Sequence, residues 1–128
     1  MDRIKMLLVD DEQEFVETLA ERLRLRELGP EVALDGERAL QLVQDEIPDV
    51  MVLDLKMPGI DGMEVLRRVR AKYPAVQVVI LTGHGSDKDR DEVMRLGAYA
   101  YLQKPVEIDE LVSVVHDAYA HRPQEATA

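Results

Sequence analysis

The chain has 128 residues, of which 46% are hydrophobic, and this suffices for one domain with a single core. It contains no cysteine, which excludes disulfides and thiolate chemistry, and it has no apolar run near the roughly 20 residues that a membrane-spanning helix needs. The net charge of −10 argues against direct binding to nucleic acid, and the N-terminus lacks the apolar segment of a signal peptide, so we expect a cytoplasmic protein. The acidic residues either serve solubility alone, or some of them gather around a cation.

Short apolar runs alternate with segments of helical periodicity along the whole chain. The runs predict strands at residues 4–9, 31–35, 50–53, 76–81 and 98–102. The other segments predict five helices, which we expect to end at Leu28–Pro30, Ile47–Asp49, Tyr73–Pro74, Gly97 and Pro123. Five strand–helix repeats indicate a three-layer, doubly wound (βα)5 fold of the α/β class with a parallel five-stranded sheet. We expect one domain over residues 1–122, followed by a tail at 123–128.

The third predicted strand carries an acidic residue at its end. Val50–Leu53 is apolar without alternation, which is typical of a strand covered on both faces. Asp54 follows it directly, and Pro58 and Gly59 then force a turn. Because open parallel sheets place their reacting groups at the carboxyl ends of strands, Asp54 is the central candidate for chemistry.

Other polar side chains follow the remaining strands. The residues just past the apolar runs are Asp10, Asp11, Asp54, Thr82 and Lys104. Since parallel strands end on one edge of the sheet, these three carboxylates, one hydroxyl and one ammonium should be neighbours. Oxygen ligands without sulfur favour Mg²⁺ or Mn²⁺. A divalent cation with a lysine and a hydroxyl suits the stabilisation of a transferring phosphoryl group.

Two motifs that are missing from the sequence limit the reactions that the site could catalyse. The sequence has no glycine-rich loop for nucleotide phosphates and no readable Ser–His–Asp arrangement. The simplest hypothesis is that a carboxylate itself accepts the phosphoryl group, as in covalent catalysis at aspartate. Each member of the set also has a plain alternative: Asp10 and Asp11 could cap the first helix, Thr82 could be a turn residue and Lys104 a surface lysine.

The chain resembles the receiver domain of two-component response regulators, of the chemotaxis-regulator-like kind. The motifs that carry the resemblance span nearly the whole chain: Val9-Asp10-Asp11, the segment 54–62, Leu81-Thr82-Gly83, Gly97-Ala98 and Lys104-Pro105. The resemblance implies a flavodoxin-like fold with sheet order 2-1-3-4-5, whose switch point lies between the first and third strands. It also implies a cis Lys104–Pro105 bond.

The resemblance also implies roles for the site residues. Asp54 would be the phosphoacceptor, and Thr82 and Lys104 would contact the phosphoryl oxygens. The ligands of Mg²⁺ (or Mn²⁺) would be Asp54, Asp11 directly, Asp10 through water and the backbone carbonyl of Lys56.

Three further positions are candidates for tuning the response. Tyr101 matches the aromatic switch position, whose ring turns inward when Thr82 moves toward the phosphate; otherwise it is a half-exposed strand residue. Lys56 and His84 flank the route of a hydrolytic water, and we hypothesise that they set the rate of phosphate loss. His84 could equally be an exposed loop residue.

The resemblance implies a sensor histidine kinase or a phosphotransfer protein as phosphodonor. An output domain or partner protein would bind through the fourth helix, fifth strand and fifth helix. Whether the chain forms a homodimer stays open, as does whether it is a stand-alone regulator or the receiver of a longer protein. We expect a switch that turns over no external substrate.

Two alternatives belong to other functional classes. One is a hydrolase with an aspartyl-phosphate intermediate, but Lys56 stands where such enzymes usually keep a second catalytic aspartate. The other is a degenerate receiver that only binds proteins, which the intact set of strand-end residues argues against.

Overall fold

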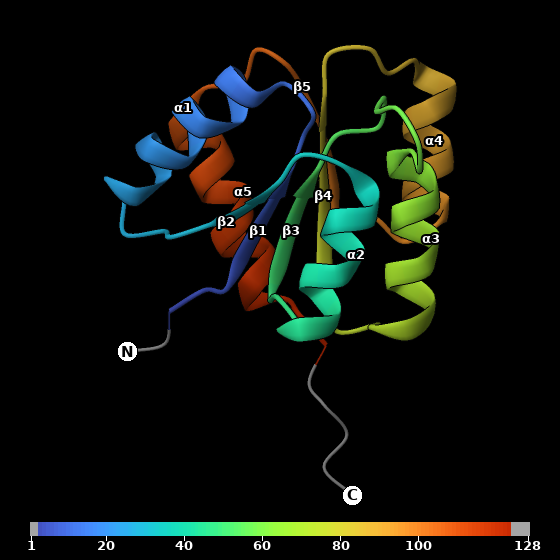
Figure 1. Ribbon diagram of the computed structural model, residues 1–128, viewed down its shortest axis with the longest axis horizontal. Helices are drawn as coiled ribbons and strands as arrows, with labels where there is room; N and C mark the ends of the chain where they lie inside the picture. The colour runs from blue at the N-terminus through green and yellow to red at the C-terminus, as the bar shows by residue number, and fades with distance from the viewer. Residues whose placement is uncertain (1–2, 124–128) are drawn as a thin grey trace, which may run out of the picture.

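The computed structural model describes residues 3–123, in which five parallel strands alternate with five helices (Figure 1). The strands are β1 (Met6–Val9), β2 (Glu31–Ala33), β3 (Val50–Leu53), β4 (Gln77–Thr82) and β5 (Ala100–Gln103). The helices are α1 (Gln13–Arg24), α2 (Gly36–Asp45), α3 (Gly62–Lys72), α4 (Asp87–Arg95) and α5 (Ile108–Ala120). The sheet order β2-β1-β3-β4-β5 confirms the predicted flavodoxin-like order. None of the described helices is long and apolar enough to cross a membrane.

Two apolar clusters, one on each face of the sheet, hold the three layers together. α1 and α5 cover one face, and α2, α3 and α4 cover the other (Figure 1). Along β3, Val50 and Val52 pack into the first cluster, while Met51 and Leu53 pack into the second. Because both faces of this strand are buried, its sequence is apolar without alternation.

The predicted strands are all present, with ends shifted by up to two residues, but the predicted end of the first helix was wrong. α1 ends at Arg24 rather than near Leu28. Glu27 adopts a positive φ of 65° and turns the chain back. The Leu28 N–H then donates to the Leu23 carbonyl over 2.9 Å, and the Leu28 side chain is buried in the cluster beneath α1 and α5.

The start of β5 also differs from the prediction, because two of its expected residues lie before the strand. Gly97 has a φ of 105°, and its N–H donates to the Met94 carbonyl. The Ala98 N–H donates to the Val93 carbonyl, which completes the closing turn of α4. Ala98 therefore belongs to the end of that helix, and β5 begins at Ala100.

Three of the helices that follow strands ending at the candidate edge begin with side-chain caps. Asp35 caps α2 and Asp61 caps α3. At α4, Ser86 and Asp89 form a reciprocal capping box. These caps fix the first turns of the helices next to the carboxyl ends of the strands.

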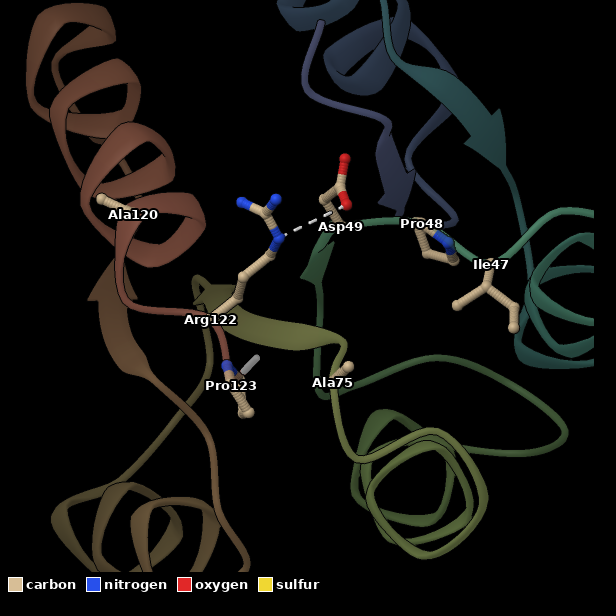
Figure 2. Close-up of a pocket in the computed structure, with 7 residues that line it drawn as sticks. All are labelled: Ile47, Pro48, Asp49, Ala75, Ala120, Arg122 and Pro123. Carbon is tan, nitrogen blue, oxygen red and sulfur yellow. Dashed lines mark ion pairs between the residues drawn. The ribbon is translucent and has the colours of Figure 1, made fainter. Parts of the chain in front are cut away.

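A hollow of about 550 Å³ lies at the opposite edge, before the start of β3 and β4 (Figure 2). Arg122, which follows α5, points its guanidinium toward Asp49, with 3.9 Å between Nε and Oδ1. Ile47, Pro48, Ala75 and Pro123 line the same hollow. Since it adjoins the amino ends of the strands, it is separate from the edge where the predicted site residues lie.

Candidate functional site

The backbone ladder of the sheet continues past the strands and places the site residues. The Asp54 N–H donates to the Val9 carbonyl over 2.9 Å, so Asp54 lies beside the end of β1, where Asp10 follows. The Lys104 N–H donates to the Thr82 carbonyl over 3.0 Å, which sets Lys104 beside the end of β4. Strand ends that are far apart in sequence therefore meet at one edge, as predicted. The Lys104–Pro105 bond is cis, which confirms that expectation.

Lys104 forms the closest ionic contacts at this edge. Its Nζ lies 2.7 Å from Asp10 Oδ2, 2.9 Å from Glu12 Oε1 and 4.0 Å from Asp54 Oδ2. The same ammonium lies 4.3 Å from the centre of the Phe15 ring in α1. These contacts hold Lys104 against the start of α1, nearer to Asp10 and Glu12 than to Asp54.

The three carboxylates around Lys104 form a compact cluster. One oxygen each from Asp10, Glu12 and Asp54 lies within 4.8 Å of the others. Asp10 and Asp54 are buried, whereas Glu12 is exposed. Carboxylates this close repel one another unless a cation offsets their charge, and the Lys104 ammonium supplies only one positive charge. The donor set is therefore chemically suited to a hard divalent cation such as Mg²⁺, which prefers oxygen ligands.

Burial and ion pairing act in opposite directions on these groups. Burial raises the pKa of Asp10 and outweighs the hydrogen bonds from Lys104 and from the Glu12 N–H, which lower it. The hydrogen bond from Lys104 lowers the pKa of the exposed Glu12 carboxyl. Burial alone would lower the pKa of Lys104, but its hydrogen bonds to Asp10 and Glu12 raise it above the usual value. Lys104 is therefore a stable cation, while folding opposes the ionisation of Asp10.

Asp54 has unused acceptor capacity inside the protein. The residue is 3% exposed, and its Oδ1 has no hydrogen-bond partner among residues 3–123. A buried polar oxygen without a partner is unusual in a folded protein. An oxygen of this kind is free to bind a cation or to act as a nucleophile.

The third carboxylate found in the cluster is not one of the predicted site residues. Within residues 3–123, Asp11 is exposed and lies outside the carboxylate cluster, and Glu12 supplies the third carboxylate. Sequence reasoning missed Glu12, although its position two residues after Asp10 was a usable signal. The role of Asp11 as a direct metal ligand stays a prediction. Asp10 also accepts the Glu12 N–H over 2.9 Å, so it orients the start of α1 as well as contacting Lys104.

Lys56 and His84 lie in exposed positions of neighbouring loops. Lys56 Nζ is 3.5 Å from Asp89 Oδ2 in the first turn of α4. A hydrogen bond from the Ser86 backbone lowers the pKa of Asp89, and the Lys56 charge adds to this effect. The His84 N–H donates to Thr82 Oγ1 over 3.4 Å. The influence of Lys56 and His84 on phosphate loss stays a prediction.

Thr82 and Tyr101 are both directed into the protein. Thr82 is fully buried at the end of β4. Tyr101 is half-buried, but its hydroxyl oxygen is buried and has no hydrogen-bond partner in the described part of the chain. The Tyr101 side chain thus lies inward, against the apolar cluster beneath α2, α3 and α4. The switch role of Tyr101 stays a prediction.

The start of α3 packs directly against the backbone of Asp54. The Gly62 N–H donates to the Leu55 carbonyl over 2.9 Å. A methyl group on Gly62 would overlap the Asp54 carbonyl oxygen and lie 2.7 Å from Leu55 Cα. The absence of a side chain at residue 62 therefore allows α3 to support the strand end that carries Asp54.

Comparisons with known proteins agree with this geometry. A family model described as the response regulator receiver domain matches residues 6–116. The receiver domain of the Francisella response regulator 1452 is 31% identical, with a TM-score of 0.86 over 92% of this chain and 98% of that one. The receiver domain of NtrX from Brucella abortus is 29% identical, with a TM-score of 0.86 over 91% of this chain and 99% of that one.

Curated relatives are longer than this chain. The response regulator MprA of Mycolicibacterium vanbaalenii is 36% identical over 110 residues, which cover 86% of this chain and 48% of that protein. An NtrX-like response regulator of Rickettsia typhi is 30% identical over 120 residues, which cover 92% of this chain and 25% of that protein. The chain thus spans between a quarter and a half of these relatives.

Proposed function

Because the chain belongs to the response regulator receiver family, we propose that it is a switch whose Asp54 accepts a phosphoryl group from a phosphohistidine. The observation that carries this proposal is the environment of Asp54. Its carboxylate is buried, Oδ1 has no hydrogen-bond partner among residues 3–123, and Oδ2 lies 4.0 Å from the Lys104 ammonium. A buried nucleophile beside a fixed cation suits attack on an anionic phosphoryl group.

The chemistry follows from the residues at the edge of the sheet. An Asp54 carboxylate oxygen would attack phosphorus, and the bond from phosphorus to the donor imidazole nitrogen would break, with its electron pair staying on nitrogen. Lys104 would offset the charge of the phosphoryl oxygens, and the Thr82 hydroxyl would donate to one of them. Mg²⁺, when bound by Asp10, Asp11, Asp54 and the Lys56 carbonyl, would neutralise further charge on the same oxygens.

Phosphorylation would act by moving groups that already touch one another. A phosphoryl group carries about two negative charges at neutral pH. It would draw Lys104 from Glu12 and draw Thr82 toward the phosphoryl oxygens. Because the His84 N–H donates to Thr82, that movement would reach the loop before α4. Phosphorylation would thus bias the domain toward a second conformation.

The partners follow from this chemistry. The phosphodonor would be a sensor histidine kinase or a phosphotransfer protein. The output partner or domain would read the surface of α4, β5 and α5.

The test is incubation with a small phosphodonor and Mg²⁺, followed by intact-mass measurement. We expect an acid-labile adduct of about 80 Da, the mass that one phosphoryl group adds. The adduct should require Mg²⁺ and should be absent from the Asp54→Asn variant. A wild-type chain that stays unmodified, or an Asp54→Asn chain that still gains the adduct, would refute the proposal.

A further inference from the structure

Tyr101 occupies an inward position that is tightly defined on one side. It lies on β5 opposite Ile80 of β4, and its ring packs against the apolar cluster beneath α2, α3 and α4. Its hydroxyl oxygen is buried without a hydrogen-bond partner among residues 3–123. The hydroxyl therefore does not anchor the ring, and its position depends on the space around it.

Gly85 provides that space. It lies in the short loop between Thr82 and the Ser86 cap of α4. A methyl group on Gly85 would overlap Tyr101 Oη, and it would lie 2.9 Å from Tyr101 Cζ and 2.9 Å from Thr82 Cγ2. Tyr101 and any side chain at residue 85 therefore cannot both occupy these positions.

Backbone conformation does not account for this glycine. The glycines with positive φ among the described residues are Gly59 and Gly97, so the backbone at Gly85 is one that alanine also adopts. What Gly85 contributes is the absence of a side chain. Replacing it with alanine thus tests the space beside residue 85, against a small opposing gain from the restricted unfolded chain.

We propose that the Tyr101 ring rests against Gly85, and that the ring can lie inward only because residue 85 has no side chain. The loop that contacts the ring starts at Thr82 and ends at Ser86, the N-cap of α4. A movement of Thr82 would thus change both the space available to the Tyr101 ring and the position of the start of α4. This link to phosphorylation rests on the proposed function, whereas the steric relation of Gly85 and Tyr101 does not.

The first measurement is the solvent exposure of Tyr101. It is read from the ¹⁹F NMR resonance of 3-fluorotyrosine-labelled protein. The chain has four tyrosines, and the resonance of Tyr101 is assigned with a Tyr101→Phe variant. We expect a buried resonance in the wild type and an exposed one in Gly85→Ala. Gly83→Ala is the matched control, because a methyl group there would meet only Lys104 carbons, at 3.7 and 3.8 Å, which is an ordinary contact.

The second measurement compares the effect of Gly85→Ala on the folding equilibrium in chains with and without the Tyr101 ring. Gly85→Ala should lower the folding equilibrium constant by roughly tenfold or more, as overpacking does. The same change should cost clearly less in a Tyr101→Ala background, where only the approach to Thr82 Cγ2 at 2.9 Å remains. If Gly85→Ala does not fold but the double variant does, the result also supports the proposal.

Several results would overturn the proposal. These are a solvent-exposed Tyr101 in the wild type, equal resonances in Gly85→Ala and Gly83→Ala, or an equal cost of Gly85→Ala with and without the ring. Failure of the double variant to fold would also count against it, because Gly85 would then be needed for something other than Tyr101. The phosphoryl adduct on Asp54 is measured separately in the same proteins, so a wild-type chain without an adduct would refute the proposed function and leave the steric result standing.

Discussion

At the scale of single residues, Lys104 is the side chain for which several groups compete. Its ammonium lies 2.7 Å from Asp10 and 2.9 Å from Glu12, but 4.0 Å from Asp54. Stabilising a phosphoryl group on Asp54 requires Lys104 to give up part of these contacts. The strength of the Glu12 contact should therefore influence how readily Asp54 is phosphorylated.

Glu12→Gln tests this competition. We expect the rate constant of phosphorylation by a small phosphodonor to rise by a factor of about 1.4 to 5, because exposed ion pairs are worth about 0.2–1 kcal/mol. Glu14→Gln is the control, since it removes the same charge two residues further along α1 from an exposed side chain. Equal rates in the two variants, or a slower Glu12→Gln, would show that Glu12 does not restrain Lys104.

Asp10→Asn tests the cost of the buried carboxylate. We expect the free energy of unfolding of the metal-free variant to exceed that of the wild type at neutral pH, because burial of the Asp10 carboxyl outweighs the contacts that favour its charged form. Folding raises the pKa of Asp10 above its ordinary value of 3.8, so the wild type loses stability as pH rises above that value. The advantage of the variant should therefore grow as pH rises above 3.8, as measured by urea unfolding at several pH values.

The same unfolding measurements with Mg²⁺ separate Asp10 from Asp11. Mg²⁺ should stabilise the wild type by mass action and should stabilise both Asp10→Asn and Asp11→Asn less. Without Mg²⁺, Asp11→Asn should stay within about 0.5 kcal/mol of the wild type, because Asp11 is exposed. An Asp11→Asn variant that keeps the full stabilisation by Mg²⁺ would remove Asp11 from the ligand set and leave Glu12 as the candidate.

At the scale of elements, α3 and α4 begin in contact with the candidate site. Gly62, the first residue of α3, packs on the Asp54 backbone. The first turn of α4 is joined to the loop after β3 by the ion pair of Asp89 with Lys56. Both helix starts are therefore positioned to respond to changes at Asp54.

Gly62→Ala tests the packing of α3 on the strand end. We expect a loss of about 1–3 kcal/mol in the free energy of unfolding, because the new methyl group overlaps backbone atoms that cannot turn aside. Gly29→Ala is the control, since nothing lies within 4 Å of a methyl group there. A Gly62→Ala variant as stable as Gly29→Ala would contradict the close contact.

Lys56→Ala and His84→Ala test the predicted control of phosphate loss. Both side chains are exposed near the site, so removing them should open the approach of water to phospho-Asp54. We expect each variant to shorten the half-life of phospho-Asp54 by up to about fivefold. This corresponds to a contribution of about 1 kcal/mol from each exposed side chain to the barrier to hydrolysis. Unchanged half-lives in both variants, measured by decay of the phosphoryl adduct, would reject this role.

At the scale of the whole molecule, the parallel sheet explains which parts of the site could be predicted from the sequence. Every strand ends on one edge, so the apolar runs alone placed Asp10, Asp54 and Lys104 together. The contact of Lys104 with Glu12 could not be predicted in this way, because it depends on the direction of side chains 92 residues apart. The same holds for Gly85, because its close approach to the Tyr101 ring depends on how the folded chain places that ring. The end of α1 was missed because the turn at Glu27 uses a positive φ that no glycine marks.

The most direct measurement locates the phosphoryl group within the chain. An aspartyl phosphate is reduced by borohydride to homoserine, which peptide mass spectrometry identifies by position. After treatment with a small phosphodonor and Mg²⁺, homoserine should appear at position 54 and at no other aspartate. Homoserine at Asp10 or Asp11, or its absence from a chain that carries the adduct, would contradict the assignment of Asp54 as the phosphoacceptor.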